Sequence, residues 1–582
     1  MFPYFRVAVV LALLSLGLTV QPKNSLIAQT ISKTTATDSW RGKRARLEFQ
    51  FGQELVKISD WCRNNGLARQ ISQTHKLKLN RDQSRQYIFL PTDKTMPDPE
   101  QQAGELKVWL EKINAAKVAH AERIFELAKE ALSQDAAGVA YQLLNEVVYH
   151  DRDHAEGRRI LDHKLKDGVW HVASNSFRFR KANKRHDYLA LGKGQYNTVE
   201  TAHFKIESTA SEQRTRKLAI ELELWHSVWR QVFFRYWGSK TTLKASFDGK
   251  QPLRIPKRKF DIFFFQNQQQ YAEKLEPLVR GIGVSSGYYD NGRRTSFFYD
   301  GDEKVQATWR HELTHQLFRE SKRRSPANVF DKNYVWLDEG VATYAESMVK
   351  LDNYVTLGGF DAERTQFARQ HALVEGSSLP TDQLNSMGQD AWKAQARVDA
   401  KLYAQSAAIV DMLMNDKRGQ HQQDLVELLK IIYPKQAKST SFKRVMNLSF
   451  DQVDQQFLQF LTVDQDVVDK HIIKPETRTF LCLANANLTK DDYLKLGKCV
   501  KLEALGLSGH ALTAEDLRPL ANCPALHTLN LLKCRFEPKA LLALAKIPNL
   551  TSVNLALSEI GPVQQNEIAQ LRQQKPGLVI KP

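Results

Sequence analysis

Two histidines near the middle of the chain have the spacing that lets them share one metal ion. Residues 311–315 read His-Glu-Leu-Thr-His, an H-E-x-x-H pattern. On a helix, His311 and His315 stand one turn apart on the same face, so both imidazoles can reach a single cation. Glu312 lies at the edge of that face, where a carboxylate can accept a proton from an attacking water. In a chain with 16 His among 582 residues, chance produces this pattern in roughly one case in fifty, so further ligands are needed to support it.

A third ligand is predicted from a second helix. Residues 334–346 read Tyr-Val-Trp-Leu-Asp-Glu-Gly-Val-Ala-Thr-Tyr-Ala-Glu. Val341, Ala345 and Met348 recur at helical spacing, which predicts an amphipathic helix with Glu339 in its first turn. A catalytic zinc ion takes three protein ligands and leaves one position open. Glu339 from this helix would complete a set of two imidazoles and one carboxylate.

These two segments together resemble the gluzincin branch of zinc metallopeptidases. Their residues are most similar to those of the aminopeptidase-N-like group, which has HExxH and W-L-N-E-G-F-A segments. The resemblance implies that His311, His315 and Glu339 bind one zinc ion and that Glu312 is the catalytic base. Asp338 stands where that group usually has Asn. The resemblance therefore does not decide which contact this residue makes with the metal ligands.

A third segment, residues 402–413, resembles the Y-x-K-G-A-x-V segment of the same peptidases, whose Tyr points at the scissile carbonyl. The resemblance implies that Tyr403 donates a hydrogen bond to the oxyanion. Gln405 and Ser406 depart from the Lys-Gly pair, and the alternative role for Tyr403 is a core aromatic with its hydroxyl at the edge. No G-A-M-E-N motif is present, so aminopeptidase specificity does not carry over. Over about residues 200–465, the pattern is more similar to a family of exported bacterial gluzincin-like proteins.

The amino terminus has the composition of an export signal. Residues 7–20 form a short apolar run after a basic flank, which is too short for a comfortable membrane span and suits a signal peptide. We expect residues 1–28 to be this signal, with an uncleaved anchor as the alternative. No later stretch is long and apolar enough to span a bilayer. The protein is therefore expected to be periplasmic, bound in the cell envelope or secreted.

The chain is long enough for two to four domains. The fold class that we predict is multidomain α+β. Residues 29–100 form a helical region ending in a linker, and residues 101–175 form a helical module that resembles a tetratricopeptide-type hairpin. The gluzincin-like metallopeptidase domain, a zincin-like fold, covers residues 176–470. An α/β leucine-rich repeat covers residues 471–582.

Strands and one long helix are expected ahead of the H-E-x-x-H segment. Alternating or continuous apolar patterns predict strands at residues 203–208, 260–265 and 295–299, and a helix at 211–234. The resemblance to gluzincins implies that the strand at 295–299 offers an exposed edge to extended substrate. The alternative is an ordinary core strand. Residues 287–290 are expected to be a loop over the cleft or a simple turn.

The last hundred residues repeat with a period of 24. Matching positions are Leu481, Leu505, Leu529 and Val553. Four units in register indicate a leucine-rich repeat in which each unit gives one strand and one helix. The outward strand positions are small or polar and are expected to line a shallow binding face: Cys482, Gly506, Asn530 and Asn554. An array this short can also serve only as a cap docked on the preceding domain.

The five cysteines favour structural roles. Cys499 and Cys523 occupy the same repeat position, Cys534 sits where such repeats favour Asn or Cys, and Cys62 suits a small buried hydrophobe. A Cys499–Cys523 disulfide is possible in an oxidising compartment, but the sequence does not decide it.

Charge and motifs narrow the function. The net charge is +18, but the basic clusters are scattered and lack interleaved aromatics, so they favour a solvated surface over specific nucleic-acid binding. We therefore expect an exported zinc-dependent metallopeptidase that acts on a peptide or protein substrate. The alternative is a non-catalytic cell-envelope protein on a retained peptidase fold, with a protein partner bound through the repeats and the helical module.

Overall fold

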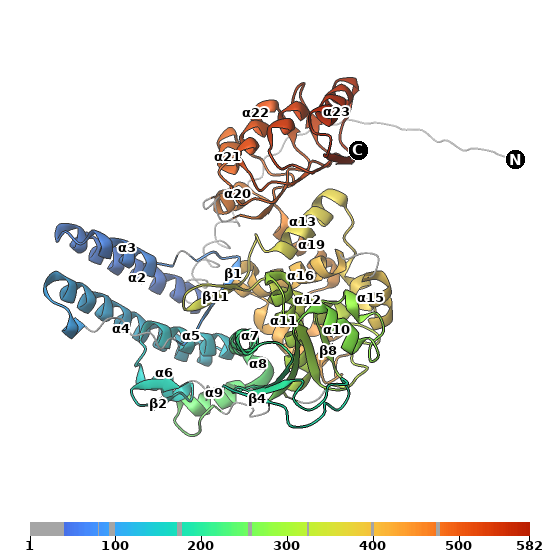
Figure 1. The fold of residues 1–582 in the computed structure, drawn as a ribbon. Helices are drawn as coiled ribbons and strands as arrows, with labels where there is room; N and C mark the ends of the chain where they lie inside the picture. Colours follow the sequence, from blue (N-terminus) through green and yellow to red (C-terminus); the bar gives the residue numbers. More distant parts are fainter. Residues whose placement is uncertain are drawn as a thin grey trace, which may run out of the picture.

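The computed structural model describes residues 40–79, 81–91, 99–171, 177–253, 259–322, 325–396, 401–472 and 478–581. The predicted signal peptide and most of the predicted linker lie outside these residues. Figure 1 shows a group of long helices beside a central body of sheet and helices, with a stack of short strands and helices at the carboxy-terminal end. None of the described helices is long and apolar enough to cross a membrane. The prediction of a mixed α/β chain with several parts is confirmed at this level.

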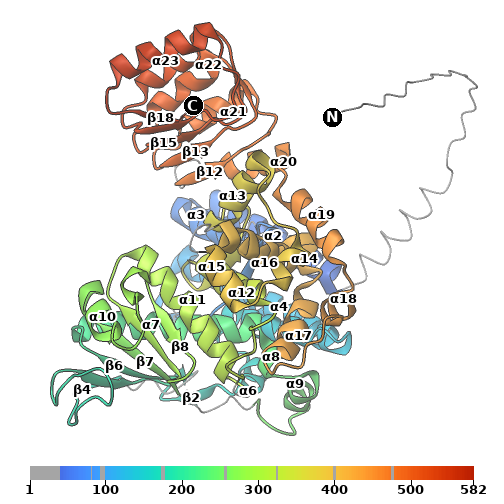
Figure 2. The same ribbon diagram turned by 90° about the vertical axis from the view of Figure 1, so that its right-hand side faces the viewer.

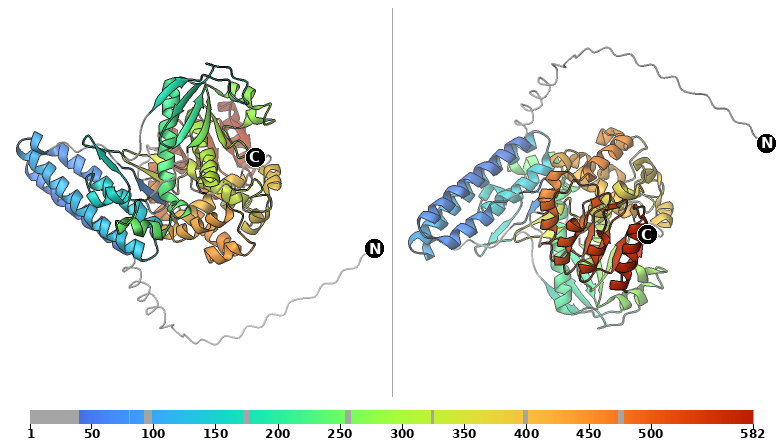
Figure 3. Two further views of the ribbon diagram at one scale, coloured as in Figure 1. Left: turned by 90° about the horizontal axis from the view of Figure 1, so that it is seen from below. Right: turned by 90° about the horizontal axis from the view of Figure 1, so that it is seen from above.

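The amino-terminal helices pack side by side, as the view from below shows (Figure 3). They are α2 (Trp40–Asn64), α3 (Ala68–Leu77), η1 (Pro99–Gln101), α4 (Gly104–Ser133), α5 (Ala137–His150) and α6 (Ala155–Ile160). Phe51 and Leu55 of α2 share a buried cluster with Trp109 and Ile113 of α4. A short antiparallel hairpin follows, made of β2 (Lys164–Lys166) and β3 (Val169–His171).

One segment of the predicted helical region is a strand that belongs to the central body. β1 (Arg85–Phe89) pairs antiparallel with β11 (Tyr354–Gly358), which also pairs with β10 (Val349–Lys350). Ile88 and Phe89 are buried, and Ile88 joins the main core. The β-branched and aromatic residues of β1 suit a half-buried strand, so the helical expectation fails here. The amino-terminal region is therefore joined to the later part of the chain by sheet pairing.

A six-stranded mixed sheet forms one half of the central body. Its strands, in spatial order, are β4 (Arg178–Lys181), β5 (Asn197–Glu200), β6 (Phe204–Ser208), β7 (Phe260–Phe265), β9 (Thr295–Tyr299) and β8 (Tyr288–Asp290). The pairs β6–β7 and β7–β9 are parallel, and the remaining pairs are antiparallel. Ile262 and Phe264 of β7 face one core, while Phe263 and Phe265 face another. Because apolar residues cover both faces of β7, its sequence is continuously apolar rather than alternating.

Residues 295–299 form an ordinary core strand, which was the alternative, and the exposed edge implied by the resemblance is wrong. β9 lies between β7 and β8, and all five of its residues are buried. The edge strand on this side of the sheet is β8, from a segment that was expected to be a loop or turn. The chain reverses direction between β8 and β9 through a turn at residues 291–294, so the two strands pair antiparallel.

Two strands of this sheet come before the first strand that the sequence pattern predicted. The strand expected at residues 203–208 is β6, an inner strand, and β4 and β5 come before it. The helix expected at 211–234 is α7 (Glu212–Val232), which begins after Ser211; the Ser211 hydroxyl accepts a hydrogen bond from the Arg214 backbone N–H. α7 covers one face of the sheet and α10 (Gln268–Leu275) the other.

Helices form the other half of the central body (Figure 2). The two that carry the predicted ligands are α11 (Glu303–Glu320) and α12 (Val335–Glu346), and α12 also packs against α16 (Lys401–Gly419). A side chain at Gly340 of α12 would come within 2.9 Å of the Ser406 carbonyl oxygen, so glycine permits the close approach of α12 and α16. The remaining elements are α8 (Phe234–Trp237), α9 (Lys240–Phe247), η2 (Ile282–Val284), α13 (Glu363–Arg369), the π-helix η3 (Gln370–Glu375), α14 (Thr381–Ser386), α15 (Gln389–Ala396), α17 (Gln422–Ile432), α18 (Ser441–Met446), α19 (Phe450–Leu461) and α20 (Gln465–Ile472).

The carboxy-terminal part is a five-stranded parallel sheet. Its strands are β12 (Phe480–Cys482), β13 (Ala504–Gly506), β15 (Thr528–Asn530), β17 (Ser552–Asn554) and β18 (Val579–Lys581). Leu481 pairs with Leu505, Leu505 with Leu529, and Leu529 with Val553, so the 24-residue period is the register of this sheet. A second, two-stranded ladder joins β14 (Ala511–Leu512) to β16 (Arg535–Phe536).

The connections between these strands are less uniform than one helix per unit. The helical elements are α21 (Lys490–Leu496), α22 (Ala514–Leu517), η5 (Arg518–Asn522), η6 (Leu541–Lys546) and α23 (Pro562–Gln574). In the second unit, Pro519 lacks the N–H group that a continuing helix needs, and a 3₁₀ turn follows α22.

The first strand of the carboxy-terminal sheet is covered by the central body. The Gln366 side chain of α13 accepts a hydrogen bond from the Cys482 backbone N–H at 2.6 Å and donates one to the Phe480 carbonyl at 2.8 Å. Cys482 is 1% exposed and Gly506 is also buried, so the expectation that these two residues line an open face is wrong. All five cysteines are buried free thiols, which does not support a Cys499–Cys523 disulfide.

Candidate metal centre

The structure brings the three predicted ligands together from two helices. Glu339 Oε2 of α12 lies 3.4 Å from His311 Nε2 and 3.7 Å from His315 Nε2 of α11. One ligand atom from each residue lies within 4.8 Å of the other two. Glu339 was expected in the first turn of its helix. Because α12 begins at Val335, Glu339 lies in the second turn.

Buried apolar residues hold the two helices in this orientation. Trp309, Leu313 and Leu317 of α11 are 1% exposed or less and face the main core. Trp336 and Leu337 of α12 are fully buried in the same core. Since each helix is fixed by one face, the polar residues on its other face meet at the centre.

Each imidazole is fixed from behind by its own carboxylate. His311 Nδ1 lies 2.9 Å from Glu346 Oε1, and His315 Nδ1 lies 3.1 Å from Asp338 Oδ1. An Nδ1–H group that donates to a carboxylate leaves the Nε2 lone pair free for a metal. Both free Nε2 atoms then face Glu339. The resemblance did not decide the contact of Asp338; in the structure it is this hydrogen bond to His315.

Further groups neutralise and hold these two carboxylates. Arg319 Nη2 lies 2.7 Å from Asp338 Oδ2, and the Tyr433 hydroxyl donates to Asp338 Oδ1 at 2.6 Å. Arg364 contacts Glu346 Oε2 through Nε at 3.1 Å and Nη2 at 3.0 Å. Such outer contacts limit the rotation of the ligand side chains.

The charges around the centre favour a cation. Burial alone would lower the pKa of His311, but hydrogen bonds to Glu339 and Glu346 raise it to about 9. The pKa of His315 is raised well above its ordinary value against burial, chiefly by the charge of Asp338. Burial acts to raise the pKa of Glu339, but the two histidines lower it to about 2. Without a metal, protons on the two imidazoles balance the negative charge of the surrounding carboxylates. A divalent cation can replace these protons.

Glu312 stands beside the edge strand. Its Oε2 accepts a hydrogen bond from the backbone N–H of Tyr289 in β8, at 2.9 Å. A side chain at Gly287 would come within 3.2 Å of Glu312 Cγ and 3.1 Å of Thr308 Cγ2, so glycine lets this segment approach α11. The predicted base and the edge strand are therefore neighbours.

Tyr403 is half-buried on α16, with its ring against Trp392 in an edge-to-face contact at 5.7 Å between centroids. Burial and the nearby charges of Glu339 and Glu312 raise the pKa of its hydroxyl. Tyr403 thus lies within electrostatic reach of both carboxylates, and its hydroxyl stays protonated and able to donate.

A cavity of about 310 Å³ adjoins the centre. Thr308 lines it from α11, Glu346 from α12, Arg364 from α13 and Asp411 from α16. Glu346 connects this cavity to the centre through its contact with His311. The cavity is therefore next to the candidate metal centre.

Sequence reasoning missed the outer contacts. Glu346 follows Glu339 by seven residues, two helical turns on the same face, so its position carried a usable signal. The sequence carried no signal for three other residues, because only the tertiary fold brings them to the centre: Arg319, Tyr433 and Arg364. A second group of potential ligands, His203, Glu223 and His226, was also missed.

Comparison with known proteins adds no relative: no family model matches the chain, and a search of curated proteins found no matching sequence. The site is therefore interpreted from its own geometry.

Proposed function

We propose that this protein is an exported, zinc-dependent metallopeptidase of gluzincin type that hydrolyses peptide bonds. The single observation that carries this proposal is the convergence of two imidazole Nε2 atoms on Glu339, with each Nδ1 atom held by a separate carboxylate. That arrangement has the ligand types and the outer contacts of a catalytic zinc site.

The donor set fits zinc better than the common alternatives. Two imidazole nitrogens and one carboxylate oxygen suit zinc and similar transition metals, whereas calcium and magnesium prefer oxygen ligands alone. His311, His315 and Glu339 would hold the ion, and the buried, negatively charged surroundings favour it. When bound, zinc lowers the pKa of a coordinated water to about 7 and polarises a peptide carbonyl.

The other residues have separate tasks. Glu312 would accept the proton of the attacking water and pass it to the leaving amine. Its hydrogen bond to the Tyr289 N–H keeps the carboxylate beside β8, where an extended peptide could pair with the edge strand. Tyr403 would donate a hydrogen bond to the carbonyl oxygen as negative charge develops there.

The surrounding parts are proposed to serve this centre. Residues 176–470 would form the gluzincin-like catalytic domain, although β1 and the hydrogen bonds of Gln366 tie it to the regions on either side. We assign residues 101–175 to a tetratricopeptide-like module and residues 471–582 to a leucine-rich repeat, supported by the 24-residue strand register. Asn530 and Asn554 remain half-exposed and are candidates for contact with a protein partner.

The proposal is tested by metal analysis of the purified full-length protein. His311→Ala/His315→Ala should lower the zinc content by one equivalent relative to the wild type, and Glu339→Ala should lower occupancy strongly. Full zinc content in a folded Glu339→Ala protein would assign the third ligand elsewhere. Zinc binding without cleavage of any peptide would favour the non-catalytic binding protein.

A further inference from the structure

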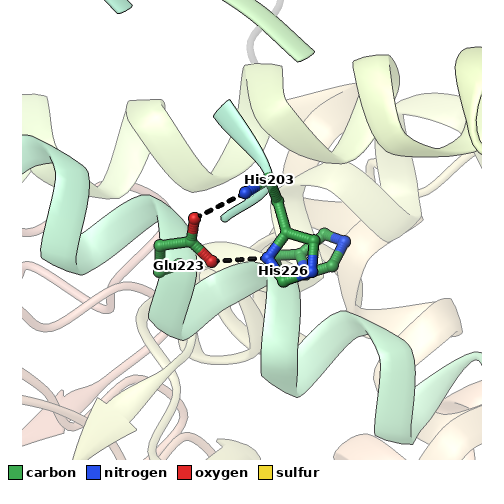
Figure 4. A group of neighbouring side chains, drawn as sticks. All are labelled: His203, Glu223 and His226. Carbon is green, nitrogen blue, oxygen red and sulfur yellow. Dashed lines mark hydrogen bonds and ion pairs between the residues drawn. The ribbon is translucent and has the colours of Figure 1, made fainter. Parts of the chain in front are cut away.

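A second group of metal-binding side chains joins a strand to a helix in the central body. His203 lies directly before β6, while Glu223 and His226 lie on α7. One ligand atom from each residue lies within 4.8 Å of the other two (Figure 4). Glu223 and His226 are three residues apart and so share one face of the helix.

Glu223 and His203 form a close pair. His203 Nδ1 lies 2.6 Å from Glu223 Oε2, and the His203 backbone N–H donates to Glu223 Oε1 at 2.9 Å. These contacts fix the start of β6 against α7. They also hold one imidazole and one carboxylate next to His226.

His226 is the residue that a simple ion pair does not explain. It is 6% exposed, and its ring makes no hydrogen bond to another of the described residues. The ring stacks on His203 with 3.9 Å between centroids and a 27° angle between planes. Most of this imidazole is withdrawn from water, and neither ring nitrogen has a hydrogen-bond partner among the described residues. A ligand held between these groups would supply the missing contact.

The chain offers a contrasting pair. His186 Nε2 lies 3.0 Å from Glu207 Oε2, and His186 is also buried, but these two residues are not part of any three-residue metal-binding group among the described residues. A buried histidine paired with a glutamate is therefore an ordinary feature of this sheet. The unpartnered third donor distinguishes the group at His203.

We propose that His203, Glu223 and His226 form a second, structural site for a divalent transition-metal ion of the zinc class. Two imidazole nitrogens and one carboxylate oxygen select such ions over calcium or magnesium. At zinc bond lengths, two ligand atoms in a tetrahedral site lie about 3.3 Å apart. His203 Nδ1 and Glu223 Oε2 would therefore separate slightly, through rotation of side chains that are 17% and 24% exposed.

The site would act on stability. β6 is an inner strand between β5 and β7, and α7 packs against α11, which carries His311 and His315. A metal bound at His203 would hold β6 of the sheet against α7, and α7 in turn supports α11. None of its ligands belongs to the first centre, so this inference does not rest on the proposed peptidase activity.

The test uses the full-length His311→Ala/His315→Ala protein, stripped of metal by a chelator. Titration with Co²⁺, followed by visible absorption, and zinc analysis after dialysis should each give one bound equivalent. Adding His226→Asn or His203→Asn should weaken binding at least about tenfold, the usual cost of disturbing a site's ligands or their supports. His186→Asn is the matched control and should leave binding unchanged.

Absence of a bound equivalent in the His311→Ala/His315→Ala protein would overturn the proposal, as would equal binding by the His226→Asn and His186→Asn proteins. If the added substitutions prevent folding, thermal unfolding of the His311→Ala/His315→Ala protein decides instead. Zinc should raise its Tm with saturation at one equivalent, and an unchanged Tm would refute the site.

Discussion

Asp338 Oδ1 lies 3.1 Å from His315 Nδ1, and Asp338 directly precedes Glu339 in the sequence. One turn of α12 therefore supplies a predicted ligand and the carboxylate that orients another ligand. Buried Arg319 balances the charge of Asp338 at 2.7 Å. This relationship makes α12 as important to the centre as the H-E-x-x-H helix.

Asp338→Asn should weaken zinc binding about 10- to 100-fold, because the amide holds His315 without a negative charge. It should also lower Tm, since Arg319 would remain buried without its ionic partner. Zinc competition with a chelator and thermal unfolding measure the two effects. Asp338→Asn/Arg319→Met should recover part of the stability but none of the affinity. Wild-type affinity in Asp338→Asn would show that the charge of Asp338 does not contribute to zinc binding.

Glu312→Gln should keep zinc and the fold, because the amide oxygen can still accept the Tyr289 N–H. It should reduce peptide hydrolysis by about 10² to 10⁴, since the amide cannot accept a proton. Initial rates at equal zinc content measure the effect. Hydrolysis at the wild-type rate would show that another group is the base.

Tyr403→Phe should lower kcat by about 10² to 10³ and leave KM nearly unchanged, because the lost hydrogen bond forms mainly in the transition state. The control is Tyr493→Phe, which removes one buried hydroxyl from α21 in the carboxy-terminal part of the protein. Unchanged kcat in a zinc-loaded Tyr403→Phe protein would make Tyr403 a core aromatic only.

Asp411 should make stability depend on pH. Burial raises the pKa of its carboxyl to about 7, although Thr365, Asn415 and Arg85 act in the opposite direction. The folded state then binds more protons than the unfolded state between about pH 4 and pH 7. The contribution of Asp411 to stability therefore falls as pH rises through this window, by up to about 4 kcal/mol.

The pH effect is checked by urea unfolding of Asp411→Asn. The substitution should raise the free energy of unfolding relative to wild type at pH 8, where the buried carboxylate is charged, and should change it little at pH 4. Asn can keep the contacts with Thr365 and Asn415. An equal difference at both pH values would show that Asp411 does not titrate in this range.

Removal of residues after 472 should destabilise the central body. Arg369 is buried and donates to the carbonyls of Leu461 at 2.9 Å and Cys482 at 3.4 Å. The truncation would leave Arg369 and Gln366 without their partners in β12. A lower Tm is expected. Full Tm and zinc content in the truncated protein would show that the two parts are independent.

Much of the centre was predictable because its signals are local. Helical spacing placed His311 and His315 on one face, and the apolar pattern around Glu339 predicted the second helix. The 24-residue period likewise predicted the register Leu481–Leu505–Leu529, since identical units stack in register.

Other features depend on distant contacts. β1 pairs with β11 across more than 250 residues, and Tyr433 reaches Asp338 from 95 residues away. The edge position of β8 follows from the strand order of the whole sheet, which its own three residues do not encode. The grouping of His203 with Glu223 and His226 also depends on distant contacts, because only the fold brings the start of β6 against α7.

The most direct test of the central claim is hydrolysis of a mixed peptide library by the full-length protein before and after chelation of zinc. We predict that the wild type cleaves peptides, that chelation abolishes cleavage, and that added zinc restores it to the wild type but not to Glu339→Ala. Cleavage that persists without metal, or no cleavage of any peptide by the zinc-loaded wild type, would contradict the proposed function.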